Sequence, residues 1–288
     1  MTKNPVKARL REGGTAIGTM ISEARTEEIA YVLAAAGFDF CVIDTEHGSA
    51  DTESLQRLSR AARSAAIVPL VRVPDISYPL IARTLDTGAL GLMVPHVETA
   101  EDAREIVRCA KYPPMGERGF GLRGGVTDYA GVSVAEAIAW SNAETMIMAQ
   151  VESRRCLGNL AEIAAVPGID VLLVGPTDLS ISLEVPGQML HPTMQEAYQQ
   201  VVAAARRGGH PSCGPQGRAV RPGHRHAAAD VLLRCATVAR GGPAGGGGAA
   251  RRAPLARRRP AAHALAGCEV LTPCSDRQIR PSQTAKVS

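Results

Sequence analysis

The segment FDFCVIDTEHG, residues 38–48, joins a short apolar run to a cluster of ionisable side chains. Its first half has the length and nearly continuous apolar character of a strand buried on both faces, as strands of parallel sheets are. Asp44, Glu46 and His47 close the segment together with a glycine. The segment therefore predicts a parallel strand whose carboxyl end carries two carboxylates and an imidazole.

Similar apolar runs alternate with helix-like segments throughout residues 1–207. The predicted strands are 16–21, 38–44, 67–73, 89–95, 145–152 and 169–175. The predicted helices are 26–37, 53–65, 80–88, 98–110, 159–168 and 193–207. Regular alternation indicates an α/β fold, either a barrel or a doubly wound sheet. No GxGxxG motif follows the first strand, which argues against a dinucleotide-binding doubly wound sheet. About six β/α units in about 200 residues match the number of residues per unit in a (β/α)8 TIM barrel.

Polar side chains stand at the carboxyl ends of the later predicted strands as well. They are Arg72, His96, Gln150, Glu152 and the segment GPTDLS at 175–180. A parallel barrel places its active site at this end, on the loops that follow the strands. We therefore expect these residues to line one pocket with the ionisable cluster of residues 44–47.

Glu152 and Asp178 follow two consecutive predicted strands, so their carboxylates are candidates for binding one metal ion. Two carboxylates leave several coordination positions open, and an oxygen-only donor set suits Mg2+ or Mn2+. Asp178 has a second interpretation, because a carboxylate just after a strand often caps the next helix.

His47 is a candidate general acid or base, because the pKa of histidine lies near neutrality. Asp44 or Glu46 would fix its tautomer, and the alternative is an ordinary surface histidine. Arg72 is a candidate clamp for a substrate carboxylate through a bidentate pair. Its alternative role is an ion pair with Asp44 or Glu46 at the rim of the barrel.

The lysines argue against a Schiff-base mechanism. The chain has four, Lys3, Lys7, Lys111 and Lys286, and none ends a predicted strand. GxSxG and P-loop motifs are absent as well. A metal, a histidine and an arginine clamp without a lysine favour chemistry through a metal-stabilised enolate.

Six segments together resemble the metal-dependent (class II) 2-oxo-acid aldolases, the family of 4-hydroxy-2-oxoheptanedioate and 2-dehydro-3-deoxyglucarate aldolases. They are FDFCVIDTEHGSAD (38–51), PLVRVP (69–74), LDTGALGLMVPHVETAEDA (85–103), YPPMGERG (112–119), QVES (150–153) and VGPTDLSISL (174–183). The resemblance runs from about residue 8 to 207 and implies a TIM barrel. It also implies reversible aldol cleavage of a 4-hydroxy-2-oxo acid into pyruvate and an aldehyde.

The resemblance assigns roles to the residues at the strand ends. Glu152 and Asp178 match the family's metal carboxylates, which hold Mg2+, Mn2+ or Co2+. His47 matches the histidine that transfers a proton directly or through water, and Asp44 matches its carboxylate partner. Arg72 matches the arginine near the pyruvate oxygens.

The remaining matches concern the substrate pocket. Gln150 matches a polar pocket residue, and the backbone around Gly175, Pro176 and Thr177 matches the part that holds the pyruvate carboxylate. Asp86 matches a recurrent family position that we count among the catalytic candidates. The resemblance also implies a homo-hexamer, a trimer of dimers in which subunits exchange the last helix.

The composition changes near Gly208. Residues 208–288 hold 13 Lys and Arg but 3 Asp and Glu, whereas residues 1–207 hold 19 and 25. The later part is rich in Gly, Ala, Arg and Pro, and a short apolar segment at 229–239 is its one candidate for a packed element. We interpret residues 1–207 as the barrel region and residues 208–288 as an atypical tail, disordered or produced by a reading-frame shift. Replacement of the last two β/α units by such a tail predicts a barrel with open edges.

Two alternatives to an active aldolase stay open. The chain is either an inactive remnant of such an enzyme or a related lyase that acts on a CoA thioester. The sequence has no apolar run long enough to span a membrane, which favours the cytoplasm. The basic tail lacks aromatic residues on which bases would stack, which disfavours nucleic acid as a partner.

Overall fold

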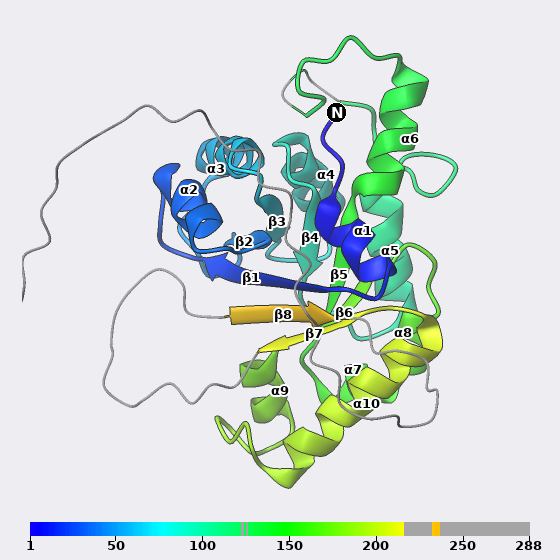
Figure 1. Cartoon of the computed structure of the whole chain (residues 1–288). Helices are drawn as coiled ribbons and strands as arrows, with labels where there is room; N and C mark the ends of the chain where they lie inside the picture. The colour runs from blue at the N-terminus through cyan, green and yellow to red at the C-terminus, as the bar shows by residue number, and fades with distance from the viewer. Residues whose placement is uncertain (122–123, 125, 216–231, 237–288) are drawn as a thin grey trace, which may run out of the picture. The chain divides into compact units, whose positions relative to one another are not determined.

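The computed structural model describes residues 1–121, 124, 126–215 and 232–236 (Figure 1). Every described residue lies within the unit Met1–Gly242. Among the described residues, no helix is long and apolar enough to cross a membrane.

The described strands form a closed barrel in the order in which they occur in the sequence. They are β1 (Thr15–Ile21), β2 (Phe40–Asp44), β3 (Val68–Arg72), β4 (Gly91–Val94), β5 (Met146–Val151), β6 (Val171–Val174), β7 (Ser212–Pro215) and β8 (Leu232–Ala236). β1 to β7 pair in parallel, each with the next. The six predicted strands are confirmed, and the parallel arrangement is that of a TIM-barrel-like α/β fold.

The closure of the barrel differs from the open edges expected from the sequence. β8 comes from the apolar segment at 229–239 and runs antiparallel to both β7 and β1. Unpaired backbone groups at the edge of a sheet are costly when they are buried, and the two short strands provide partners for β1 and β6. An antiparallel neighbour needs no helical crossover, so closure does not require complete seventh and eighth β/α units. The proposed reading-frame shift or disorder of the tail concerns residues that lie mostly outside the described ones.

Helices surround the strands. They are α1 (Pro5–Arg11), α2 (Glu28–Ala35), α3 (Thr52–Ser64), α4 (Tyr78–Asp86), α5 (Ala100–Ala110), α6 (Val134–Glu144), α7 (Arg154–Gly158), α8 (Leu160–Ala164), α9 (Pro176–Ser182) and α10 (Pro192–Gly208). The six predicted helices correspond to α2, α3, α4, α5, α8 and α10, whereas α1, α6, α7 and α9 were not predicted.

Capping residues explain where two of these helices begin. α5 starts with a capping box of Thr99 and Asp102, in which each side chain accepts a hydrogen bond from the other residue's backbone N–H. The same motif at Ser133 and Glu136 starts α6. No helix was predicted between residues 110 and 145, although this second box is a local signal for one.

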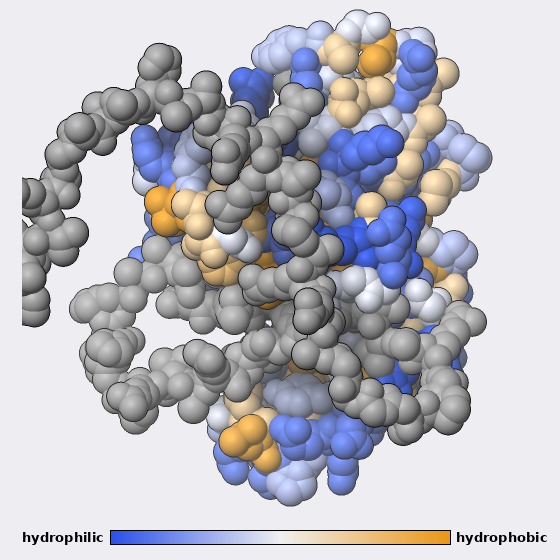
Figure 2. Space-filling view, in the orientation of Figure 1, coloured by the Kyte–Doolittle hydropathy of each residue, from blue (hydrophilic) through white to orange (hydrophobic). Residues whose placement is uncertain are grey.

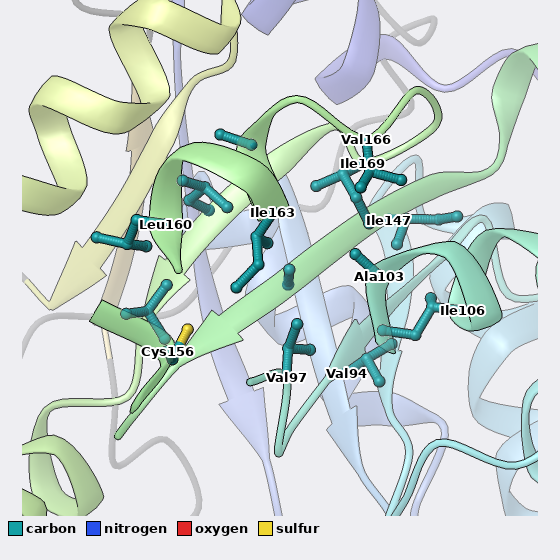
Figure 3. Close-up of a cluster of buried hydrophobic side chains, with 14 of the residues drawn as sticks. Val94, Val97, Ala103, Ile106, Ile147, Cys156, Leu160, Ile163, Val166 and Ile169 are labelled. Atoms are coloured by element: carbon teal, nitrogen blue, oxygen red, sulfur yellow. The ribbon is translucent and has the colours of Figure 1, made fainter. Parts of the chain in front are cut away.

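The two faces of the strands pack into separate clusters. The barrel interior contains Phe40, Val42, Val68, Leu70, Met93, Met146, Met148, Val171 and Leu173. The outer face packs against helices, and Figure 3 shows side chains of β4 and β5 meeting those of α5 and α8. Because successive strand residues point to opposite faces, this alternation also determines which residues at the strand ends turn inward.

On the described part of the surface that is visible in Figure 2, apolar residues form separate patches among hydrophilic ones. Exposed large apolar side chains of the described part include Tyr31, Val32, Tyr129 and Leu190. Single exposed apolar residues of this kind are common on soluble domains.

Candidate active site

Strand alternation brings polar side chains to one end of the barrel interior. In β2, side chains two residues apart point to the same face, so Asp44 points inward as Val42 does. The same alternation directs Arg72 at the end of β3, Gln150 in β5 and Glu152 just after β5 inward. Polar residues therefore replace apolar ones at the last inward positions, and the carboxyl end of the barrel becomes a polar mouth, as predicted.

The carboxylate of Asp44 and the guanidinium of Arg72 form a bidentate pair. Arg72 Nε donates to Asp44 Oδ1 at 2.8 Å, and Nη2 donates to Oδ2 at 2.6 Å. Asp44 is 1% exposed and also accepts the backbone N–H groups of Glu46 and His47. Burial would raise the pKa of Asp44, but its hydrogen bonds with Arg72 and the charge of Arg72 hold that pKa below its ordinary value. Asp44 is therefore an anion that fixes both Arg72 and the loop after β2.

Further contacts link this pair to the next strands. Arg72 Nη1 lies 3.1 Å from Glu46 Oε2, and His96 Nε2 lies 3.3 Å from Glu46 Oε1. The backbone N–H of His96 donates to Glu152 Oε1 at 2.6 Å. His96 has a positive φ of 57°, a backbone conformation that non-glycine residues rarely adopt. A continuous series of polar contacts thus crosses from β2 to β5.

Glu152 and Gln150 form the inner part of the site. Glu152 is 8% exposed, and its Oε2 accepts a hydrogen bond from Gln150 Nε2. Burial, aided by the negative charge of Asp178, raises the pKa of Glu152 above its ordinary value, although the His96 N–H acts in the opposite direction. Gln150 Oε1 is buried and has no hydrogen-bond partner in the structure. A buried carboxylate and an unpaired amide oxygen are both acceptors that a cation would stabilise.

A cavity of about 330 Å3 opens beside these residues. Its lining includes the predicted residues His47, Arg72, Gln150, Gly175, Pro176, Thr177 and Asp178, and the apolar residues Met20, Met93, Leu173 and Val174. Asp178 lies in the first turn of α9, whose N-cap is Gly175. The helix-capping interpretation of Asp178 was therefore wrong, and its exposed side chain stays available to the cavity.

The imidazole of His47 stands at the rim of this cavity. Its side chain is 68% exposed, and Nε2 lies 3.7 Å from Glu46 Oε1. Asp44 instead accepts the backbone N–H of His47 at 3.3 Å. Of the two carboxylates considered as partners of the imidazole, the structure places Glu46 beside the ring and Asp44 beside the backbone.

Asp86 lies apart from the other predicted residues. It is the last residue of α4, and its Oδ1 accepts a hydrogen bond from Arg118 Nη2 at 2.5 Å. A helix that follows a barrel strand returns toward the amino end of the barrel, so its last residue is far from the mouth. Asp86 does not line the cavity, and its proposed role stays a prediction.

Two contributions to the site were not predicted. His96 ends a predicted strand but received no role; its backbone N–H donates to Glu152 Oε1, and its ring Nδ1 lies 3.4 Å from the same oxygen. Gly48 completes the EHG triplet for a steric reason: a Cβ at this position would lie 2.2 Å from the carbonyl oxygen of Asp44. The glycine itself was the available signal, since close backbone approach excludes every side chain.

The donor set fits a divalent metal ion. The oxygens of Glu152, Asp178 and Gln150 are hard ligands of the type that Mg2+ and Mn2+ prefer. The four carboxyl groups of Asp44, Glu46, Glu152 and Asp178 outnumber the single guanidinium of Arg72. Among the described residues, no three His, Cys, Asp or Glu side chains form a ready-made metal cluster.

Gly175→Ala is expected to impair the site more than the fold. A Cβ there would lie 2.8 Å from Gln150 Nε2 and 3.0 Å from Glu152 Oε2, so both side chains would have to move. We expect kcat/KM to fall about 10- to 100-fold, because small displacements of reacting groups are costly. Steady-state kinetics and thermal unfolding measure the two effects. Gly158→Ala, where a Cβ meets open space, is the control; equal losses in the two variants would contradict the prediction.

Comparison with known proteins places the chain in a family. The chain matches the family described as HpcH/HpaI aldolase/citrate lyase over residues 19–212. The 2-keto-3-deoxy-L-rhamnonate aldolase of Escherichia coli (strain K12) is 37% identical over 218 residues, which cover 73% of this chain and 78% of that protein.

Solved structures agree with this relationship. The HpcH/HpaI aldolase from Desulfitobacterium hafniense DCB-2 is 39% identical, with a TM-score of 0.69 over 72% of this chain and 80% of that one. Citrate synthase SbnG is 31% identical, with a TM-score of 0.66 over 74% and 82% of the two chains. The resemblance seen in the sequence is thereby confirmed: the chain belongs to the HpcH/HpaI aldolase/citrate lyase family of carbon–carbon lyases.

Proposed function

We propose that this chain is a divalent-metal-dependent aldolase that cleaves a 4-hydroxy-2-oxo acid into pyruvate and an aldehyde. The observation that carries the proposal is the composition of one cavity. It combines Asp178 and Gln150, which lies against Glu152, with the cation Arg72 and the imidazole of His47. A volume of about 330 Å3 suits a small organic acid.

The chain's own residues would bind the pyruvate half of the substrate. Arg72 has five N–H donors, and three of its contacts go to Asp44 and Glu46. Its remaining N–H groups are available to substrate oxygens, and the backbone around Gly175 and Thr177 lines the same wall. Met20, Met93 and Leu173 supply an apolar surface for the carbon chain. Glu152 and Asp178 would hold the ion, with Gln150 beside them.

Proton transfer falls to His47. The imidazole would take the proton from the C4 hydroxyl as the C3–C4 bond breaks, directly or through water, and would return one to C3 of the product. Glu46, 3.7 Å from Nε2, stabilises the imidazolium that this step creates. A bound divalent ion supplies Lewis-acid stabilisation of the negative charge that develops on the 2-oxo oxygen.

The first substrates to examine are 2-oxo-3-deoxy sugar acids, because one relative is named for 2-keto-3-deoxy-L-rhamnonate. Such substrates would place the enzyme in sugar-acid catabolism. We also propose a homo-oligomer, on the basis of the family resemblance.

The test is pyruvate release by the purified 288-residue chain from a series of 4-hydroxy-2-oxo acids, with Mg2+ or Mn2+ and with excess EDTA. EDTA should abolish release, and added metal should restore it. His47→Ala should lower kcat about 10²- to 10⁴-fold, the usual contribution of a general acid or base. Tyr31→Ala, an exposed change on α2, is the control.

Two outcomes would contradict the proposal. Inactivity of the folded, metal-loaded chain beside an active relative would favour an inactive remnant. Turnover that requires a CoA thioester would favour a related lyase.

A further inference from the structure

A second polar cavity lies at the opposite end of the barrel. Its volume is about 360 Å3, and its lining includes Lys7 and Arg11 of α1, Lys111 after α5, Asp170 before β6, and His210 after α10. The helix α1 precedes β1, and Asp170 directly precedes β6, so the cavity is at the amino end of the strands. The active-site cavity shares none of these residues.

Two buried ammonium groups meet in this cavity. Lys7 is 5% exposed and Lys111 is 1% exposed. Lys7 Nζ and Lys111 Nζ each donate to the carbonyl oxygen of Thr145 at 2.7 Å, so the two nitrogens lie close together. Buried lysines are rare unless their charge is compensated, so such a pair requires an explanation.

The neighbouring acceptors compensate Lys7 but not Lys111. Lys7 Nζ lies 2.9 Å from Asp170 Oδ2, and Asp170 also lies 3.5 Å from Arg11. The described contacts of Lys111 Nζ are with two backbone carbonyls, those of Asn142 and Thr145. An ammonium has three donors, so each lysine keeps one N–H beyond these contacts.

The charged groups around the cavity leave a positive excess. Lys7, Lys111 and Arg11 face Asp170 and the more distant Glu144, whose carboxylate already accepts the backbone N–H of Asn4. His210 Nε2 lies 2.7 Å from the carbonyl oxygen of Ala164, and because that oxygen can only accept, the hydrogen bond requires a proton on Nε2.

We propose that this cavity binds a small oxyanion, such as sulfate or phosphate, between Lys111, Lys7 and Arg11. The anion supplies the counter-charge that Lys111 lacks and accepts the remaining N–H of each lysine. In its absence, burial and the charge of Lys7 lower the pKa of Lys111 to about 7. A bound anion stabilises the protonated amine of Lys111, so anion binding above pH 7 is accompanied by uptake of a proton at Lys111.

The experiment uses the full chain and sulfate, whose charge does not change near neutral pH. Thermal unfolding is followed at pH 6.5 against sulfate concentration, with sodium chloride at matched ionic strength as reference. A saturable rise of Tm by about 3 °C or more is expected in sulfate alone. Phosphate is the second arm, and acetate tests whether a planar carboxylate suffices.

Variants separate the site from general salt effects. Lys111→Met should lose the sulfate-dependent rise, whereas Lys3→Met, a change at an exposed lysine, should keep it. Calorimetry in two buffers of different ionisation enthalpy should detect uptake of up to about one proton per sulfate at pH 8 in the native chain. Lys111→Arg should bind sulfate without this uptake, because arginine stays charged.

Equal effects of sulfate and chloride would overturn the proposal. So would an unchanged response of Lys111→Met, or sulfate binding without proton uptake at pH 8. Because Lys111→Arg retains the charge, it also keeps the test valid if the methionine variant fails to fold. None of these measurements depends on aldolase activity.

Discussion

Replacing Glu152 with glutamine is expected to abolish tight Mn2+ binding and to lower kcat/KM for pyruvate release by about three orders of magnitude or more. A thousandfold loss corresponds to about 4 kcal/mol of transition-state stabilisation. Glutamine keeps the shape of the side chain and a hydrogen-bond acceptor for the His96 N–H. It removes the charge that, with Asp178, would hold the ion.

Direct metal binding separates this prediction from a folding defect. Mn2+ titration followed by electron paramagnetic resonance measures the affinity, and thermal unfolding in EDTA measures the fold. Glu101→Gln is the matched control, because Glu101 forms an exposed pair with Arg104 on α5. Retention of Mn2+ affinity by Glu152→Gln would remove Glu152 from the metal site. The unfolding temperature in EDTA should fall little, since burial already disfavours the charged form of Glu152.

Arg72→Met is expected to damage both stability and activity. It leaves the carboxylate of Asp44, which is 1% exposed, without its bidentate partner, and it also removes the cation beside Glu46. Breaking a buried pair on one side typically costs about 3–5 kcal/mol. We expect a loss of this size in the free energy of unfolding, and a fall in kcat/KM of about 10²-fold or more from the lost substrate contact.

Two further variants test the cause of the Arg72 effect. Arg72→Lys keeps the charge but not the planar fork, so it should recover part of the stability and little of the activity. Arg104→Met, at an exposed pair, should change stability by no more than about 1 kcal/mol. Denaturant unfolding measures these differences, and similar values for Arg72→Met and Arg104→Met would contradict the buried-pair argument.

The pH dependence of the Arg72 effect has a definite sign. Arg72 holds the pKa of Asp44 below its ordinary value. A depressed carboxyl pKa stabilises the fold at pH values above the unfolded pKa, and this contribution is lost as the pH falls through the folded pKa. The advantage of the native chain over Arg72→Met should therefore be full near neutrality and shrink below about pH 4.

The sequence predicted the barrel and its mouth because both depend on local patterns. Continuous apolar runs mark buried strands, and a polar residue at the last inward position of a run marks the mouth. Asp44 and Arg72 were placed correctly by that rule. The role of His96 was not predicted, because its backbone N–H reaches Glu152 from a left-handed conformation that no side-chain pattern indicates.

Features that depend on contacts between distant segments were harder to predict from the sequence. The pair between Asp86 and Arg118 joins positions 32 residues apart, so its place away from the cavity could not be deduced from the LDTG motif. β8 pairs with β1 across most of the chain, and its sequence lies in a region of low complexity. The capping box at Ser133 was a local signal, and α6 could have been predicted from it.

The polar contacts that run from Asp44 through Arg72, Glu46 and His96 to Glu152 have a consequence for the evolution of this site. Substitutions at linked positions do not act independently, because each change alters the charge balance of its neighbours. A path to a new specificity is therefore epistatic: a change at Glu46 that is harmful alone becomes tolerable once Arg72 or His96 has changed. Libraries that vary these residues together will reach sequences that successive single substitutions cannot.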